Sequence, residues 1–212
     1  MNKEHKNTIV VTTLVTLLPL VVGLLLWNRL PAQIPIHWNF AGEIDGYSGK
    51  LFAVVGLPLF LAAMHLVCAV AMGIDPKKDN ITGKVYSMVL WIIPVITLGV
   101  MGAVYVAALG VAIDIVSIVG ILVGLLFVVM GNYMPKCSRN YTVGYRLPWT
   151  LEDEENWNKT HRLAGKMYVL GGLLMLISVP LGFFTAALLA ATLLAVVPVA
   201  YSYRMYRKAH NA

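Results

Sequence analysis

The sequence predicts an all-α integral membrane protein with six transmembrane helices and both termini in the cytoplasm. Of its 212 residues, 59% are hydrophobic and only 12% are charged, whereas charged residues make up about 25% of an ordinary soluble domain. A mean hydropathy of +0.77 points the same way. This composition excludes a disordered chain, a coiled coil, a soluble nucleic-acid binder and a disulfide-stapled secreted domain.

Long uncharged stretches set the number of spans. Four stretches carry at most one charge between them: residues 9–27, 51–72, 85–130 and 167–203. The first two each suit one crossing of a hydrocarbon core about 30 Å thick, but the last two are too long for a single helix. We expect the third stretch to fold back near Asp114 and the fourth at Pro180–Gly182, because proline and glycine favour a turn there. Six spans result.

The distribution of Lys and Arg supports this topology. With the N-terminus in the cytoplasm, only Arg29 and Lys50 of the 16 basic residues lie outside, and the other 14 lie inside. Cytoplasmic loops of membrane proteins carry such an excess of positive charge. The first span is longer than the apolar core of a signal peptide and no small-residue cleavage site follows it, so we expect an uncleaved anchor. The chain should therefore lie in the cytoplasmic membrane as a multi-pass protein.

Two polar loops are long enough to carry function, an outer loop at 28–50 and an inner loop at 131–166. The outer loop should be an ordered cap because its prolines and glycines restrict the backbone. His37, Glu43 and Asp45 are conceivable metal ligands, but this set is nonspecific. We favour a structural role for His37, Trp38 and Asn39 and expect no metal and no cofactor.

Within the inner loop, Thr150 and Asp153 resemble a capping box, which predicts a helix that starts at Leu151. Trp157 and His161 would then lie on one stripe of that helix. Arg146 is the sharpest candidate, because its planar guanidinium can bind a carboxylate or a phosphate through two parallel hydrogen bonds. An ion pair with the acidic residues at 152–155 explains it equally well.

Together the two loops resemble the SdpI family of bacterial membrane proteins. The outer loop resembles the domain of unknown function that precedes the family's main domain, at Ile34–Asn39, Gly42 and Asp45. The inner loop matches the main domain's pattern at Gly131, Asn132, Pro135, Asn140, Gly144, Arg146, Pro148–Leu151, Trp157, Thr160, His161 and Gly165. One departure is Leu147, where the family pattern has Thr. The resemblance covers about residues 10–73 and 115–200.

The resemblance implies three sequence domains: an N-terminal two-helix domain at 1–73, a cytoplasmic linker at 74–84, and a four-helix SdpI-like domain at 85–212 that contains the 131–166 loop. It also implies immunity to a secreted antimicrobial peptide toxin, together with recruitment of a transcriptional repressor to the membrane. The expected partners are that toxin, that repressor and anionic lipids of the inner leaflet, without direct nucleic-acid binding.

The candidate residues for partner or lipid binding all lie in the inner loop: Asn132, Asn140, Arg146, Trp149, Trp157 and His161. Turn chemistry is an alternative for the two asparagines, as interfacial packing is for the two tryptophans. His65 lies inside the second span, where an ionisable group marks either a transport site or a hydrogen bond within the bundle.

Three classes of function therefore compete. An immunity and binding protein leads, a small membrane transporter is second, and a membrane-embedded enzyme is third. No enzyme is expected, because the sequence has neither a His-Glu-x-x-His nor a Gly-x-Ser-x-Gly motif. A transporter would normally place several charges near the bilayer midplane, where only His65 qualifies here.

Overall fold

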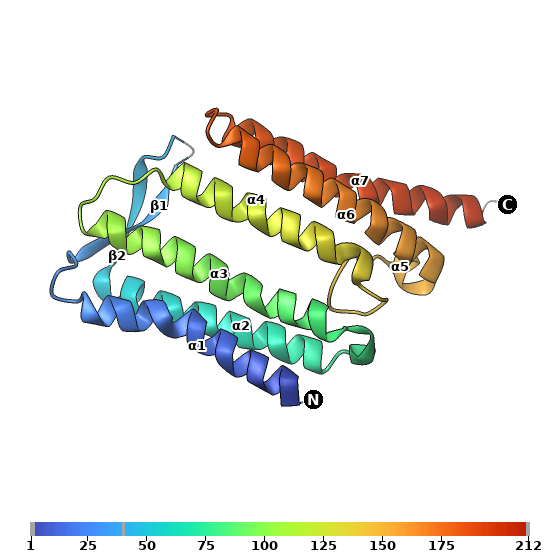
Figure 1. The fold of residues 1–212 in the computed structure, drawn as a ribbon, viewed down its shortest axis with the longest axis horizontal. Helices are drawn as coiled ribbons and strands as arrows, with labels where there is room; N and C mark the ends of the chain where they lie inside the picture. Colours follow the sequence, from blue (N-terminus) through green and yellow to red (C-terminus); the bar gives the residue numbers. More distant parts are fainter. Residues whose placement is uncertain (1–2, 40, 211–212) are drawn as a thin grey trace. The chain divides into compact units, whose positions relative to one another are not determined.

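The computed structural model describes residues 3–39 and 41–210 and is mainly helical (Figure 1). Its longer helices are α1 (Lys3–Leu25), α2 (Leu57–Gly73), α3 (Gly83–Ala108), α4 (Ile115–Tyr133), α6 (Glu154–Ser178) and α7 (Phe184–His210). Shorter elements are the helix α5 (Pro148–Glu152) and the strands β1 (Gln33–Trp38) and β2 (Ile44–Gly49). A π-helical segment, η1 (Phe52–Gly56), leads into α2, and η2 (Lys78–Asn80) and η3 (Met134–Lys136) are single 3₁₀ turns. The chain packs as two compact units, residues 1–69 with 89–122 and residues 70–88 with 123–212.

Five helical segments are long and apolar enough to cross a membrane: His5–Leu25, Phe52–Gly73, Gly83–Ala108, Ile115–Lys136 and Phe184–His210. The predicted class, an α-helical membrane protein with several spans, is therefore confirmed. The helix α6 differs from these five because its first half, up to Lys166, is polar. The apolar remainder of α6 is where the sequence predicts the fifth of six spans.

The two hairpin turns lie where the uncharged stretches were expected to fold back. Gly110 follows α3 and has a φ of 84°, and Gly182 precedes α7 with a φ of 72°. L-residues with a side chain rarely adopt this left-handed conformation, so glycine suits both turns. Asp114 begins the next helix, because its carboxylate accepts a 3.0 Å hydrogen bond from the backbone N–H of Ser117. That bond and a second one from the Ser117 hydroxyl lower the pKa of Asp114.

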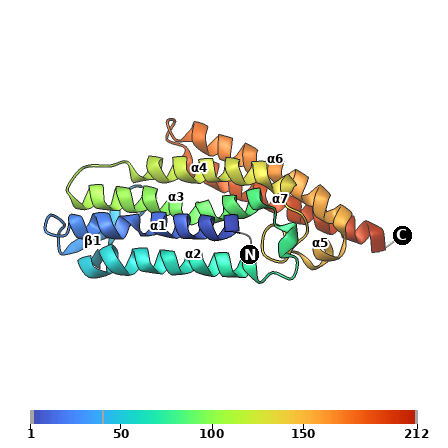
Figure 2. The ribbon, with the colours of Figure 1, turned by 60° about the horizontal axis from the view of Figure 1, so that its bottom comes forward.

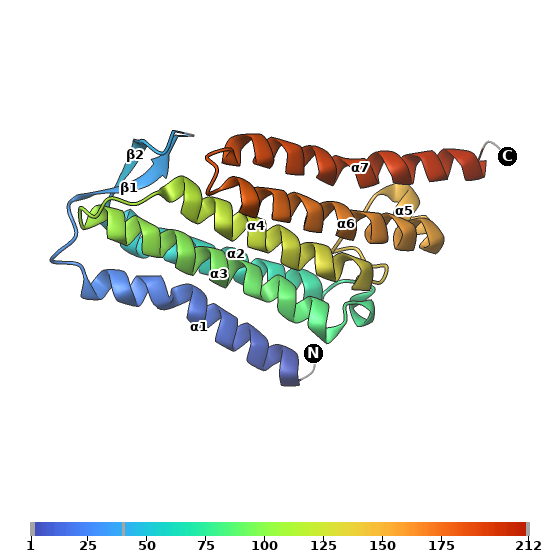
Figure 3. The same cartoon turned by 45° about the horizontal axis from the view of Figure 1, so that its top comes forward.

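The first unit carries a small antiparallel hairpin of β1 and β2, which was not predicted from the sequence (Figure 3; β1 is also labelled in Figure 2). Its register is irregular around His37, where a bulge interrupts the pairing. Ile34 anchors the hairpin, because its fully buried side chain belongs to a core cluster that also holds Val54 and Tyr105. Gly23 leaves room for Tyr105, whose hydroxyl donates a 2.9 Å hydrogen bond to the carbonyl of Pro19.

In the second unit, α6 and α7 lie side by side, and α5 lies next to the start of α6 (Figures 1 and 3). The predicted helix start at Leu151 is wrong. The hydroxyl of Thr150 accepts a 3.0 Å bond from the Leu147 N–H and donates a 2.6 Å bond to the Tyr145 carbonyl. It therefore serves the short helix α5, which ends at Glu152. Asp153 caps α6 instead, because its carboxylate accepts from the backbone N–H groups of Glu155 and Asn156 in the first turn of that helix.

Candidate functional site

The segment between η3 and α5 is held in shape by Asn140, which is almost fully buried. Its side-chain oxygen accepts hydrogen bonds from the backbone N–H groups of Thr142 (2.9 Å) and Val143 (2.6 Å). Its amide donates to the carbonyls of Ser138 (2.8 Å) and Val143 (3.1 Å). All of these bonds are local, so Asn140 shapes the backbone that presents the neighbouring side chains.

A buried carboxylate that sequence reasoning missed ties this segment to the end of α2. Asp75 is 5% exposed. One carboxylate oxygen accepts from the Tyr141 N–H (2.9 Å) and the Thr142 hydroxyl (2.5 Å), and the other accepts from the Lys77 N–H (2.7 Å). An aspartate before Pro76 is typical of an ordinary helix-ending turn, so no local pattern indicates a partner 66 residues away.

His161 lies at the centre of the site and forms hydrogen bonds with both ring nitrogens. Nδ1 is 2.8 Å from the Trp157 carbonyl and must donate, while Nε2 is 3.0 Å from the Tyr145 N–H and must accept. This pairing defines a neutral ring, assigned here from its partners. Burial lowers the pKa of His161, and the bond to the Trp157 carbonyl opposes this only in part. The geometry makes His161 a neutral structural link, not a proton carrier.

Gly144 is required beside this histidine. Its φ of 109° is a conformation that favours glycine. A Cβ at this position would also overlap the Nε2 atom of His161. The absence of a side chain therefore lets the Tyr145 N–H reach the His161 ring. The side chain of Tyr145 is itself partly buried, and this burial raises the pKa of its phenol.

The two tryptophans attach the site to its surroundings in different ways. Trp157 is fully buried, stacks on His161 with ring centres 4.1 Å apart, and donates a 2.7 Å bond to the Cys137 carbonyl. Burial raises the pKa of the Cys137 thiol to about 11. Trp149 is half-buried and donates a 3.0 Å bond to the hydroxyl of Ser202 on α7. The carbonyl of Ser202 also accepts a 3.0 Å hydrogen bond from the Asn156 amide. Ser202 was not among the candidates named from the sequence.

Arg146 is exposed at the edge of this cluster. Within the described residues its guanidinium makes one hydrogen bond, a 2.9 Å donation to the Tyr141 carbonyl. The ion pairs among those residues are His37–Asp45 and Lys159–Glu155, so Arg146 is not paired there with the acids at 152–155. Most of its guanidinium donors thus face solvent and are available to a ligand. Asn132 is also exposed, and it lines a separate groove between α4 and α6.

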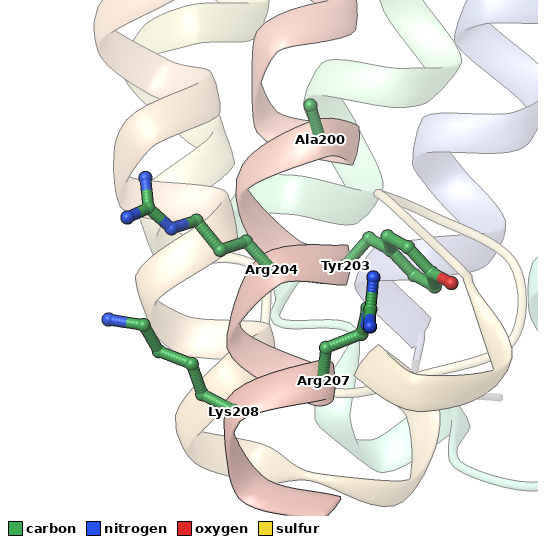
Figure 4. Close-up of a pocket in the computed structure, with 5 residues that line it drawn as sticks. All are labelled: Ala200, Tyr203, Arg204, Arg207 and Lys208. Atoms are coloured by element: carbon green, nitrogen blue, oxygen red, sulfur yellow. The ribbon is translucent and has the colours of Figure 1, made fainter. Parts of the chain in front are cut away.

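A further group of cations, which sequence reasoning treated only as topology signals, lies at the end of α7. Arg204, Arg207 and Lys208 line a shallow depression with Tyr203 (Figure 4). Arg204 and Lys208 extend to one side of the helix, and Arg207 lies beside the Tyr203 ring (Figure 4). The Tyr203 ring also packs against Trp149, with ring centres 5.3 Å apart. This basic end therefore belongs to the same unit as the site.

The remaining candidates lie in the first unit. His65 is fully buried, and its Nε2 is 2.9 Å from the Thr12 hydroxyl. That hydroxyl donates to the Thr8 carbonyl at 2.6 Å, so the ring donates to Thr12. The other ring nitrogen has no hydrogen-bond partner in the part of the chain that the structure describes. This is the bundle hydrogen bond that was one of the two interpretations of His65.

In the hairpin, the exposed His37 ring is 2.5 Å from Asp45. The side-chain oxygen of Asn39 accepts from the N–H groups of Ala41 and Glu43 and so closes the turn, while Trp38 packs against the core of the unit. Across residues 3–39 and 41–210, no three His, Cys, Asp or Glu side chains gather where they could share a metal ion.

Acidification should destabilise the site through His161. Because burial holds its pKa below the ordinary 6.5, the stabilisation by the neutral ring is complete above about pH 6.5 and is lost as the pH falls toward the lowered pKa. Each pH unit of acidification in that interval lowers the free energy of unfolding by at most about 1.4 kcal/mol. The unfolding temperature in detergent, measured at pH 8 and pH 5.5, should fall more for the natural chain than for His161→Gln. An equal fall in both proteins would contradict this role.

The fold and the site define a multi-pass membrane protein in which a polar loop is packed onto the last two helices. Residues 136–202 match the SdpI/YfhL protein family, and residues 14–62 match a domain of unknown function, DUF1648. The resemblance found in the sequence is thereby confirmed. The chain is similar to the immunity protein SdpI of Bacillus subtilis (strain 168), with 25% identity over 213 residues that cover 96% of this chain and 98% of the relative. No solved structure matches the chain.

Proposed function

We propose that this protein protects its cell against a secreted antimicrobial peptide toxin. The observation that carries the proposal is the similarity to an immunity protein over 96% of the chain. The site adds physical support, because its buried contacts are structural and leave exposed cations for binding. Such a site suits recognition of a partner, not chemistry on a substrate, so the proposed function is non-enzymatic.

The partners in this proposal are the peptide toxin, a cytoplasmic transcriptional repressor and anionic lipids of the inner leaflet. The protein would act in the cytoplasmic membrane. A small transporter is the second candidate, favoured by one observation: His65 is buried inside a span with an unpaired ring nitrogen within the described residues. One polar pair at this depth is a weak basis for transport, because transport sites usually combine several charges.

We further propose six spans with both termini in the cytoplasm, and the sequence domains 1–73, 74–84 and 85–212. The support is the bias of 14 basic residues to one side, together with the apolar second half of α6. In this topology the 33–49 hairpin faces outward and the 131–166 loop faces inward.

Cysteine labelling tests this orientation. In a background with Cys68→Ala and Cys137→Ala, single cysteines are placed at Ser48 in the hairpin and at Asn158 on α6. The two cysteines should differ in their accessibility to a reagent outside the cell. An impermeant thiol reagent added to intact cells should label position 48 alone, and permeabilisation should then expose position 158. Labelling of position 158 in intact cells would overturn the proposed orientation.

Arg146 is the proposed anchor for a partner at the inner face. Its guanidinium makes one bond to a backbone carbonyl and presents its other donors to solvent. A carboxylate or phosphate could therefore accept two parallel bonds, which an ammonium group cannot supply in the same geometry. Trp157 and His161 would hold this surface on α6 in a fixed position.

The experiment expresses the gene alone in a bacterium sensitive to the toxin and counts survivors after exposure. The natural chain should protect, whereas Arg146→Ala and Arg146→Lys should both abolish protection at normal membrane abundance. The control is Lys159→Ala, which removes an equal charge from an exposed pair worth little to stability. Full protection by Arg146→Ala would exclude this residue as the anchor, and absence of protection by the natural chain would refute the immunity function.

A further inference from the structure

A groove of about 580 Å³ lies between the C-terminal end of α4, with the turn η3 that follows it, and the middle of α6. One end is polar and is lined by Asn132, Arg162 and Lys166. The other end is apolar and is lined by Val169, Leu170 and Leu173. The groove thus changes from cationic to apolar along its length.

Two glycines keep the floor of the groove open. A Cβ on Gly165 would lie 2.7 Å from the carbonyl oxygen of Gly131, and a Cβ on Gly131 would lie 2.7 Å from the carbonyl oxygen of Gly165. The two helix backbones therefore touch, and no side chain projects from the floor at that level. Because backbone atoms form it, this part of the groove is rigid.

The two cations of the polar end lie close together on one helix. Arg162 and Lys166 are exposed and are spaced four residues apart on α6, where like charges repel. Neither belongs to an ion pair within the part of the chain that the structure describes. An anion seated between them would remove the repulsion and accept charge-assisted hydrogen bonds. The Asn132 amide could donate a further bond to the same anion.

The position of the groove along α6 indicates what carries that anion. Lys166 is the last charged residue of α6, and the helix is uncharged from residue 167 to its end at Ser178. On the other wall, α4 belongs to a candidate membrane span that ends at Lys136. The cationic end therefore lies at the boundary of the apolar segments, and the apolar end lies within them. A phospholipid has the same order, with a phosphate at the interface and acyl chains below it.

We propose that this groove binds one anionic phospholipid from the leaflet next to the 131–166 loop. The phosphate lies between Arg162 and Lys166, and one acyl chain follows Val169, Leu170 and Leu173. The inference rests on the proposed function, which includes anionic lipids among the partners, and it adds the site at which one such lipid binds. Its test reads lipid binding and not protection against a toxin, so the two can fail separately.

The test measures thermal stabilisation of the purified full chain in detergent by three probes: dioctanoyl phosphatidylglycerol, dioctanoyl phosphatidylcholine and inorganic phosphate. Native mass spectrometry counts the lipids retained. A ligand that binds only the folded protein raises the unfolding temperature according to its affinity. The anionic lipid should bind with a stoichiometry of one and at least about tenfold more tightly than the zwitterionic lipid. Both lipids carry the phosphate, but the choline cation of the zwitterionic lipid would be repelled by Arg162 and Lys166.

Matched variants assign the effect to the groove. Arg162→Gln with Lys166→Gln should weaken binding of the anionic lipid by about tenfold or more. Arg204→Gln with Arg207→Gln, on the basic end of α7 shown in Figure 4, removes the same charge and should leave binding unchanged. The swap Arg162→Lys with Lys166→Arg keeps both charges and should retain binding. Should the double glutamine variant not fold, Lys166→Gln alone serves with the same expectation.

Three results would overturn the inference. Equal weakening by the α7 variant would show general attraction to a basic surface. Equal stabilisation by inorganic phosphate would show a site for a free anion, and equal binding of phosphatidylcholine would show that the charge of the lipid is not recognised.

Discussion

Gly165→Ala should prevent stable packing of α6 against α4. A Cβ at Gly165 would lie 2.7 Å from the Gly131 carbonyl oxygen and 2.9 Å from the ring of Pro135. Neither can withdraw like the end of a flexible side chain, because one is backbone and the other is a closed ring. Overpacking of this kind costs about 1–3 kcal/mol where the surroundings can relax. Here we expect the upper end of that range or more, with a large loss of folded protein.

The matched control is Gly102→Ala on α3, an exposed position where a Cβ would meet nothing within 4 Å. In a helix, alanine is favoured over glycine by up to about 1 kcal/mol. Gly102→Ala should therefore raise the unfolding temperature in detergent slightly, whereas Gly165→Ala should lower it or leave only aggregated protein. If both variants unfolded at the same temperature as the natural chain, the close contact between the two helices would be disproved.

The class of fold could be predicted because the bilayer imposes a simple rule on the sequence. A span needs about 20 apolar residues without charge, and the turns between spans need residues that tolerate unusual backbone angles. Both features are local, so Gly110 and Gly182 could be placed without knowledge of the packing. The hairpin at 33–49 was harder, because Pro35 and the glycines of β2 disfavour strands, and the buried side chain of Ile34 holds it in place instead.

The site could be located by its residue types but not assembled. Thr150 and Asp153 have the spacing of a single cap, yet they serve two different helices, since the Thr150 hydroxyl bonds to Tyr145 and Leu147. His161 was a candidate for partner or lipid binding, but its hydrogen bonding depends on the Tyr145 N–H, which reaches the ring only because Gly144 has no side chain. This pairing joins residues 16 positions apart, and no local spacing encodes it.

Asp75 shows this limit most clearly, and its removal should have the second large effect. Asp75→Ala leaves the N–H groups of Tyr141 and Lys77 without their acceptor. It also removes the shorter bond of the Thr142 hydroxyl, whose other acceptor is the Ala71 carbonyl at 3.4 Å. An unsatisfied buried polar group costs about 1–3 kcal/mol. Because part of this region can open to water, we expect the free energy of unfolding to fall by about 3–5 kcal/mol in total. The amides of Tyr141 and Thr142 should then exchange hydrogen faster, and protection against the toxin should be lost with the loop's shape.

Asp79→Ala is the matched control, because it removes the same charge from an exposed position in η2, four residues away. It should leave the unfolding temperature and the exchange rates unchanged. Asp75→Asn should fall between the two, since its amide group can accept through only one atom and would face at least one backbone donor. In a double-mutant cycle, Thr142→Val should lower the free energy of unfolding less in the Asp75→Ala background than in the natural chain. In that background the Thr142 hydroxyl has already lost its bond to Asp75. Strict additivity, together with unchanged exchange at Tyr141, would mean that Asp75 does not hold the loop.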